Sequence, residues 1–181
     1  TAMGSGFDPR RGASLTGRVL QPVLHDEAGN RVVLGYRVTE SGMTLAVAAD
    51  HRIETTDAYE VKTQVEQDLA KRVFRVQATQ GTTLRITKTV SYHTSRRIPP
   101  VELVDRCRRT LDRVAADGVE TIFTKQRVWL ADFWERSDVE IEGQPALQQA
   151  VRWNLFQLIQ ASARAEGTGV PAKGVTGSGY D

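Results

Sequence analysis

The sequence has few of the residues that would indicate disulfides, a membrane span or a nucleic-acid partner. Its 181 residues contain one cysteine, Cys107, so no disulfide can form within the chain, and a cytoplasmic location is expected. No apolar run approaches the roughly 20 residues that a membrane-spanning helix needs. The 24 basic and 22 acidic residues leave a net charge of +2. That balance predicts neither nucleic acid nor a membrane surface as a partner.

Motifs for metal binding or nucleophilic catalysis are also missing from the sequence. Its three histidines are His25, His51 and His93, and none stands four residues from another histidine or a carboxylate in a predicted helix. Each lies on or beside a predicted strand, which favours surface or structural roles over a zinc site. Cys107 lies on the apolar side of a predicted helix and is interpreted as a small core residue. No metal and no cofactor are expected.

Two halves with different hydrophobic periods make up the chain. Residues 15–92 alternate apolar and polar positions with turn signals between them, such as the polar break at residues 26–30, Ser41-Gly42 and Gln80-Gly81. This pattern predicts about six antiparallel strands, a β-sandwich or part of one. About 80 residues bury a core only marginally. The strands must therefore pack on the helical half or belong to a larger sheet system, and the pattern does not choose between these alternatives.

After Pro99-Pro100 the apolar residues recur every three or four positions. This spacing predicts helices from Val101 to about Asp117, from Val119 to about Glu135, and from Pro145 to about Ala165. The fold class expected is therefore α+β.

On the first helix, arginines alternate with acidic residues, which favours a solvated or ion-paired face over a nucleic-acid patch. Trp129, Phe133 and Trp134 could stack on a sugar, but their helical spacing favours core packing. Arg152, within an apolar helix, either ties down a loop or faces a polar centre.

The last ten residues, "AKGVTGSGYD", hold three glycines after Lys173. A phosphate-binding P-loop requires the lysine after the glycines and a strand before them, so the residue order excludes that motif. A structured loop bent around a ligand and a flexible end fit the glycine spacing equally well.

Four segments, "SRRIPPVELVDRCRRTLDRV", "QRVWLADFWERSDVEIEG", "QQAVRWNLFQLIQASAR" and "GVPAKGVTGSGYD", resemble consecutive parts of glycoside hydrolase family 65. This family contains maltose, trehalose and kojibiose phosphorylases and acid trehalases. Residues 1–14 are expected to be a disordered or tag-like N-terminus. The resemblance implies part of a super-β-sandwich at residues 15–94. It further implies a helical linker at residues 95–143, and the first helix and glycine-rich loop of an α/α toroid at residues 144–181.

The resemblance also implies an inverting phosphorylase or hydrolase that acts on an α-glucosyl disaccharide, with inorganic phosphate as a possible co-substrate. In such a family member the general-acid glutamate lies further along the sequence, so the chain is expected to be a fragment without a catalytic residue and inactive alone. Its expected partners are the remainder of its own catalytic domain and a second copy in a homodimer. Lys173, Thr176 and Tyr180 are the expected substrate-binding residues. The alternative is a non-catalytic carbohydrate-binding or structural module.

Overall fold

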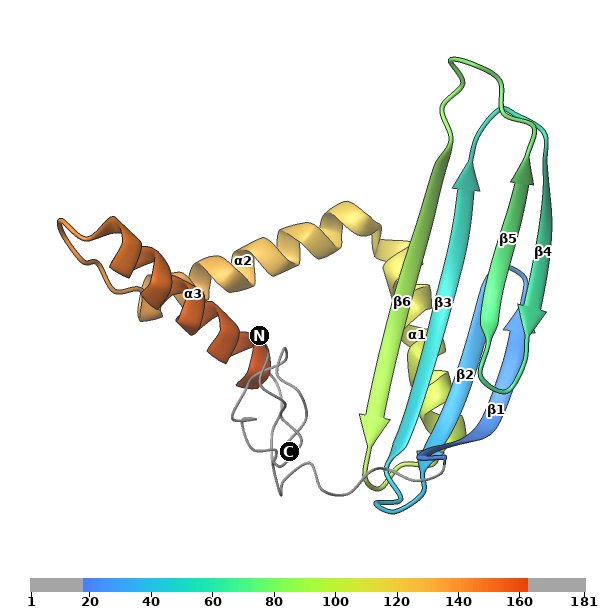
Figure 1. Ribbon diagram of the computed structural model, residues 1–181, viewed down its shortest axis with the longest axis horizontal. Coiled ribbons are helices and arrows are strands. Elements are labelled where there is room, and N and C mark those ends of the chain that lie inside the picture. The colour runs from blue at the N-terminus through green and yellow to red at the C-terminus, as the bar shows by residue number, and fades with distance from the viewer. Residues whose placement is uncertain (1–17, 163–181) are drawn as a thin grey trace, which may run out of the picture. The chain divides into compact units, whose positions relative to one another are not determined.

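The computed structural model describes residues 18–162, which form six strands followed by three helices (Figure 1). This order confirms the α+β class and the number of strands that the hydrophobic pattern predicts. The elements are β1 (Leu20–Ala28), β2 (Arg31–Val38), β3 (Thr44–Glu54), β4 (Tyr59–Val65), β5 (Ala70–Val76), β6 (Arg85–Ser95), α1 (Pro100–Asp117), α2 (Val119–Ser137) and α3 (Pro145–Ser162).

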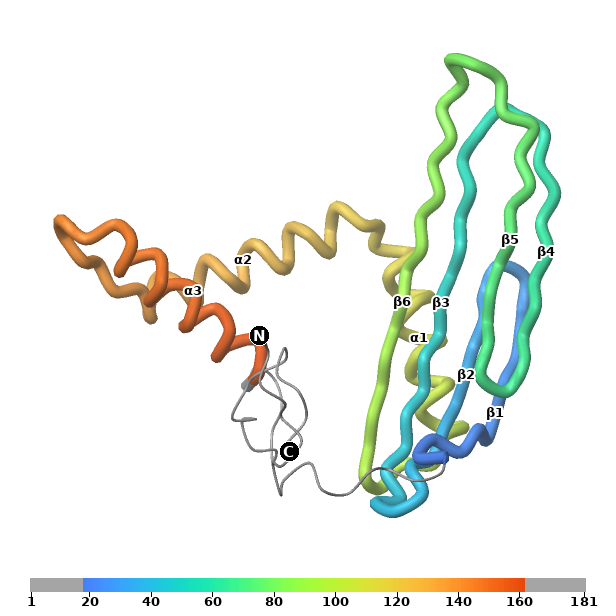
Figure 2. Tube along the Cα trace, viewed as in Figure 1, coloured from blue at the N-terminus to red at the C-terminus, as the bar shows by residue number. Residues whose placement is uncertain are grey.

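The strands form two antiparallel sheets. Four of them lie in the order β1-β2-β3-β6, and β4 and β5 form a separate hairpin. The hairpin packs on one face of the larger sheet, with β4 against β1 and β5 against β2 (Figure 2). The Tyr36 hydroxyl on β2 donates a hydrogen bond to the carbonyl of Gln67, in the hairpin's turn, at 3.2 Å. The arrangement is the β-sandwich that the sequence predicts, with one large and one small layer.

Helix α1 covers the other face of the four-stranded sheet. Its residues Leu103, Val104, Cys107 and Leu111 are fully buried against small sheet residues, Ala46 and Ala48 among them. Small side chains let the helix approach the sheet closely, and the Cys107 sulfur lies 3.5 Å from two sheet carbonyl oxygens. Of the two alternatives that the sequence left open for the strands, the structure shows their packing on the first helix. Cys107 is confirmed as a core residue, and its burial raises the pKa of its thiol.

The ends and the outer face of α1 follow local sequence signals. Pro100 lies in its first turn, and Gly118 ends it with a backbone φ of 79°, a conformation that favours glycine. On the exposed side Arg106 pairs with Glu102 and Arg108 pairs with Asp105. The ion-paired face predicted for this helix is confirmed.

The first strand differs from the prediction at its end. Asp26, Glu27 and Ala28, which the sequence suggests as a polar break, continue β1 and pair with Val33, Val32 and Arg31. The backbone of a strand hydrogen-bonds whatever its side chains, and the Asp26 carboxylate accepts a hydrogen bond from Arg108 on α1 at 2.6 Å. The turn shrinks to Gly29 and Asn30, where Gly29 has a φ of 59°.

Among the described residues, 18–122 and 123–162 belong to two separate compact units. Within the second unit α2 contains no fully buried residue. Trp129, Phe133 and Trp134 are only half-buried, so the predicted core packing is wrong for these residues, because two helices bury too little surface to form a core. None of the three helices is long and apolar enough to cross a lipid bilayer.

Candidate functional site

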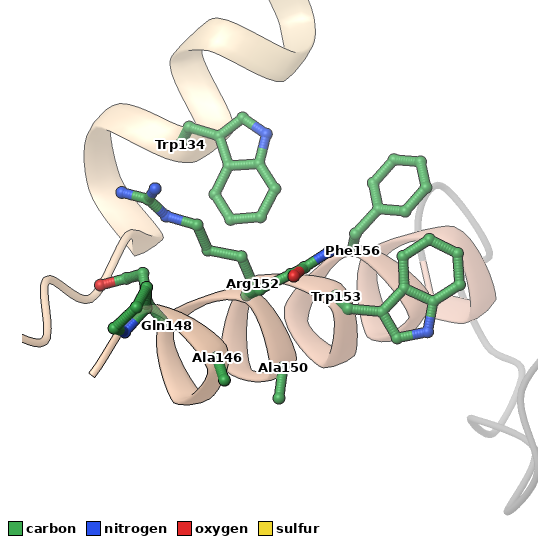
Figure 3. A pocket seen from close by; sticks show the side chains of 9 residues that line it. Trp134, Ala146, Gln148, Ala150, Arg152, Trp153 and Phe156 are labelled. Atoms are coloured by element: carbon green, nitrogen blue, oxygen red, sulfur yellow. The ribbon is translucent and has the colours of Figure 1, made fainter.

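An apolar groove of the second unit lies between the end of α2 and α3. It encloses about 760 Å³. Figure 3 shows Trp134 of α2 lying over Arg152 of α3, with Trp153 and Phe156 nearer the C-terminal end of α3. Its lining residues are Trp134, Pro145, Ala146, Gln148, Gln149, Ala150, Arg152, Trp153 and Phe156.

The loop between α2 and α3 is fastened to α3 by one glutamine. The backbone N–H of Ile141 donates to Gln148 Oε1, and Gln148 Nε2 donates to the Val139 carbonyl, both at 2.6 Å. Gly143, with a φ of 73°, makes the turn that brings the chain back to Pro145. Gln148 therefore satisfies two backbone groups of a segment that belongs to neither a helix nor a strand.

Arg152 fixes the start of the same loop. Its Nε donates to Asp138 Oδ1 at 2.8 Å, and its Nη2 donates to Asp138 Oδ2 at 2.5 Å, which is a bidentate pair. These hydrogen bonds lower the pKa of the Asp138 carboxyl and raise that of the Arg152 guanidinium. Of the two interpretations that the sequence left open for Arg152, the structure supports the one in which it ties down a loop.

The groove therefore offers aromatic surface more than free polar groups, because two of its polar side chains are already bonded to the loop. Trp153 is 60% exposed, and its ring centroid lies 6.2 Å from that of Phe156 at a tilt of 43°. Trp134 stands edge-on to Phe133, with centroids 5.0 Å apart. Flat apolar rings of this kind can cover the apolar face of a sugar or the side chains of another protein segment.

The substrate-binding residues expected from the sequence, Lys173, Thr176 and Tyr180, lie outside the described residues, as do residues 1–14. Within residues 18–162 no group of three or more histidine, cysteine, aspartate or glutamate side chains is placed to hold a metal ion. The Gln148 contacts could not be predicted from the sequence, since the two backbone groups that Gln148 meets precede it by seven and nine residues and carry no motif.

Comparison with known proteins decides the family. A family model described as "Glycosyl hydrolase family 65, N-terminal domain" matches residues 1–133. The chain belongs to glycosyl hydrolase family 65. This membership confirms the resemblance carried by the four sequence segments.

Relatives within family 65 match almost the whole chain. An uncharacterized glycosyl hydrolase of Mycobacterium tuberculosis (strain H37Rv) is 38% identical over 174 residues, and the alpha,alpha-trehalose phosphorylase of Thermoanaerobacter brockii is 34% identical over the same length. Both alignments cover 96% of this chain and 22% of the relative. The chain thus spans about a fifth of the length of these family members.

A solved structure shares the fold. It is assigned as a kojibiose phosphorylase from the human microbiome and superposes with a TM-score of 0.62 at 19% sequence identity. The superposition covers 79% of this chain and 19% of the other. At this level of identity the likeness supports the sandwich followed by helices, and nothing about the substrate.

Proposed function

We propose that the protein to which this chain belongs is an inverting phosphorylase or hydrolase that cleaves an α-glucosyl disaccharide such as maltose, trehalose or kojibiose. The single observation that carries the proposal is the 34% identity to a trehalose phosphorylase across 96% of the chain. The match to the family 65 model agrees with it. A maltose phosphorylase also matches, over a shorter stretch of the chain, and a kojibiose phosphorylase matches at a lower sequence identity. The substrate is therefore proposed as a class of disaccharide.

The proposed reaction requires a general acid that lies outside these 181 residues. A glutamic acid protonates the glycosidic oxygen, while inorganic phosphate, or water activated by a carboxylate, attacks the anomeric carbon from the opposite face. The bond to the leaving sugar breaks as the new bond forms, with inversion at that carbon. No cofactor takes part in this scheme. We place the enzyme in the cytoplasm as a homodimer.

Within this chain we assign substrate binding to the glycine-rich segment. Lys173 and Thr176 orient neighbouring loops or sugar hydroxyls, and Tyr180 forms a wall of the sugar site. The support is the position of this segment in the family 65 resemblance, directly before the residues expected to grip the non-reducing glucose. The sandwich and α1 then act as a rigid support for that segment.

The second candidate is a non-catalytic carbohydrate-binding or structural module, and the aromatic groove between α2 and α3 favours it. Its exposed Trp153 is a natural platform for a sugar ring.

A turnover assay separates the two candidates. The 181-residue chain and a protein of the relatives' length that carries it are each incubated with maltose, trehalose and kojibiose, with and without inorganic phosphate. We expect the longer protein to cleave one of the disaccharides and the 181-residue chain to cleave none. Activity of the shorter chain would contradict the placement of the general acid. If the longer protein is also inactive while the tryptophan fluorescence of the shorter chain responds saturably to a disaccharide, the binding module is the better description.

A further inference from the structure

Three basic side chains from three strands gather beside the turn between β1 and β2. His51 on β3 and Lys88 on β6 are directly opposite each other in the sheet register, so their side chains leave the same face. Lys88 contributes to the wall of a hollow on the face away from α1. Arg72 on β5 reaches the same turn from the hairpin, and its Nη1 donates to the Gly29 carbonyl. The backbone N–H of His51 donates to the neighbouring Asn30 carbonyl at 3.0 Å.

Two nitrogen atoms of this cluster, His51 Nδ1 and Arg72 Nε, are buried and have no hydrogen-bond partner among residues 18–162. An arginine Nε always carries a hydrogen and can only donate, so it requires an acceptor. Buried polar groups are nearly always hydrogen-bonded, and each exception calls for a bound molecule or another explanation. A group that accepts from both nitrogens would remove the deficit.

The charge around these nitrogens favours a negative ligand over a neutral one. In the part of the chain that the structure describes, Arg72 contacts the Gly29 carbonyl, the Thr63 hydroxyl and the ring of Phe74, and none of these groups carries a negative charge. Burial, then the charges of Lys88 and Arg72, lower the pKa of His51, while the Asn30 carbonyl and Asp50 oppose them more weakly. The Asp50 carboxylate is already bound by Arg31 through both oxygens. The cluster therefore has uncompensated positive charge.

The space between the two sheets next to the cluster is not completely filled. A hollow of about 100 Å³ lies there, and Lys88 shares its wall with apolar residues of β2 and β3 and with Ala70 of β5.

We propose that His51, Arg72 and Lys88 form a binding site for a small oxyanion of the size of inorganic phosphate. Arg72 Nε and His51 Nδ1 donate hydrogen bonds to its oxygens, and Lys88 supplies a further positive charge. The site joins β3, β5 and β6, so an anion held there links the hairpin to the four-stranded sheet. It is independent of the glycine-rich segment and of the proposed disaccharide.

The test is a titration of the isotope-labelled 181-residue chain with inorganic phosphate, at constant ionic strength balanced with sodium chloride. We expect the side-chain nitrogen resonances of His51 and Arg72 to shift saturably, with a Kd on the order of 1 mM, and the melting temperature to rise along the same curve. Arg72→Gln should abolish both responses. The matched control is Arg75→Gln, because Arg75 lies on the same strand but is 85% exposed and paired with Glu60; it should leave both responses unchanged.

Lys88→Gln provides a second variant that leaves the contacts of the hairpin in place. It should weaken phosphate binding several-fold while the chain stays folded, as judged by its circular dichroism. The proposal is overturned if phosphate produces no saturable shift at His51 and Arg72, which would leave a bound water as the partner of both nitrogens. It is overturned equally if Arg72→Gln and Lys88→Gln both bind phosphate as the unaltered chain does.

Discussion

The guanidinium of Arg31 holds both oxygens of the Asp50 carboxylate, with Nε 2.7 Å from Oδ1 and Nη2 2.9 Å from Oδ2. The two residues are also direct neighbours across β2 and β3. The same Nη2 lies 2.8 Å from the carboxylate of Asp112 on α1. One half-buried arginine thus joins two strands to the helix that covers them. The hydrogen bonds with Asp50 raise the pKa of Arg31, so the guanidinium stays charged at any ordinary pH.

Asp50→Asn should lower the free energy of unfolding by about 2 kcal/mol. The change leaves Arg31, whose side chain is 16% exposed, with only the more exposed Asp112 as counter-charge, and removing one partner of a buried pair is costly. Urea denaturation measures the effect. Arg52→Ala is the control, since Arg52 pairs with Glu54 at the surface and its loss should change the free energy by less than about 0.5 kcal/mol. Equal effects of the two changes would contradict the role of Asp50.

Because α1 packs closely on the sheet, substitutions at two small residues beneath it should differ in their effect on stability. Ala48→Leu should destabilise the chain by about 2 kcal/mol or more, because Ala48 is completely buried and a larger side chain must push the helix away. Gly35→Ala should be tolerated, since an added Cβ would lie 3.5 Å from the nearest side-chain atoms, which is ordinary van der Waals contact. Chemical denaturation of both variants tests this, and a large loss at Gly35→Ala would show that the helix lies closer than described.

His93 predicts a pH dependence of stability. Burial and the charges of Arg106, Arg109 and Arg113 lower its pKa below the ordinary 6.5. As the pH falls below 6.5, the unfolded chain therefore binds this proton before the folded chain does, and stability decreases down to the folded pKa. His93→Gln should lose less stability than the unaltered chain between pH 7.5 and 5.5, as measured by urea denaturation at each pH.

Thr110→Val is the comparison for His93. Its hydroxyl lies 3.1 Å from His93 Nε2, so the change removes the hydrogen-bond partner while the titrating ring remains. This variant should keep a steeper pH dependence than His93→Gln. Identical pH profiles for the unaltered chain and His93→Gln would exclude a contribution from this residue.

Gln148→Ala should loosen the loop between α2 and α3 without unfolding the sandwich. The change removes both hydrogen bonds that hold Val139 and Ile141, each worth about 1 kcal/mol. The amide of Ile141 should then exchange with solvent at least about fivefold faster in a hydrogen-exchange experiment. Gln149→Ala, one position away, should leave that exchange rate unchanged, and acceleration by both changes would show that the effect is not specific to Gln148.

Tyr180→Ala should lower kcat/KM for the disaccharide by about tenfold or more in a protein of the relatives' length, if Tyr180 forms a wall of the sugar site. Lys173→Ala should do the same, and Ser178→Ala, in the same segment, serves as the control. Steady-state kinetics with the preferred disaccharide measure all three. Unchanged kinetics of Tyr180→Ala and Lys173→Ala would remove both residues from the proposed site.

Local patterns predicted most of the elements, because alternation and helical spacing are properties of short segments. The stop of α1 at Gly118 and the start of α3 at Pro145 follow from single residues whose backbone preferences are strong. The end of β1 could not be predicted, since Asp26 stays in the strand through a contact with Arg108, 82 residues later. The packing of α1 on Ala46 and Ala48 depends on strand order in the same way.

The candidate sites were even harder to predict than the fold, because they depend on contacts between residues that are far apart in the sequence. The hydrogen bonds of Gln148 and the meeting of His51, Arg72 and Lys88 have no local signature, because each partner is an ordinary residue in its own segment. The assignments to Lys173, Thr176 and Tyr180 came from family resemblance rather than from residue chemistry, and they remain predictions.

The pairing of β3 with β6 has a consequence for how the chain folds. Their register begins where Glu54 meets Arg85, so residues 55–84, the β4–β5 hairpin included, form a loop that must close before the sheet is complete. The hairpin involves only local pairing and can form early, whereas closing the loop costs chain entropy before any β3–β6 contact compensates for it. We therefore expect the rate-limiting step of folding to be the arrival of β6, with α1 docking on the sheet only once that strand is in place.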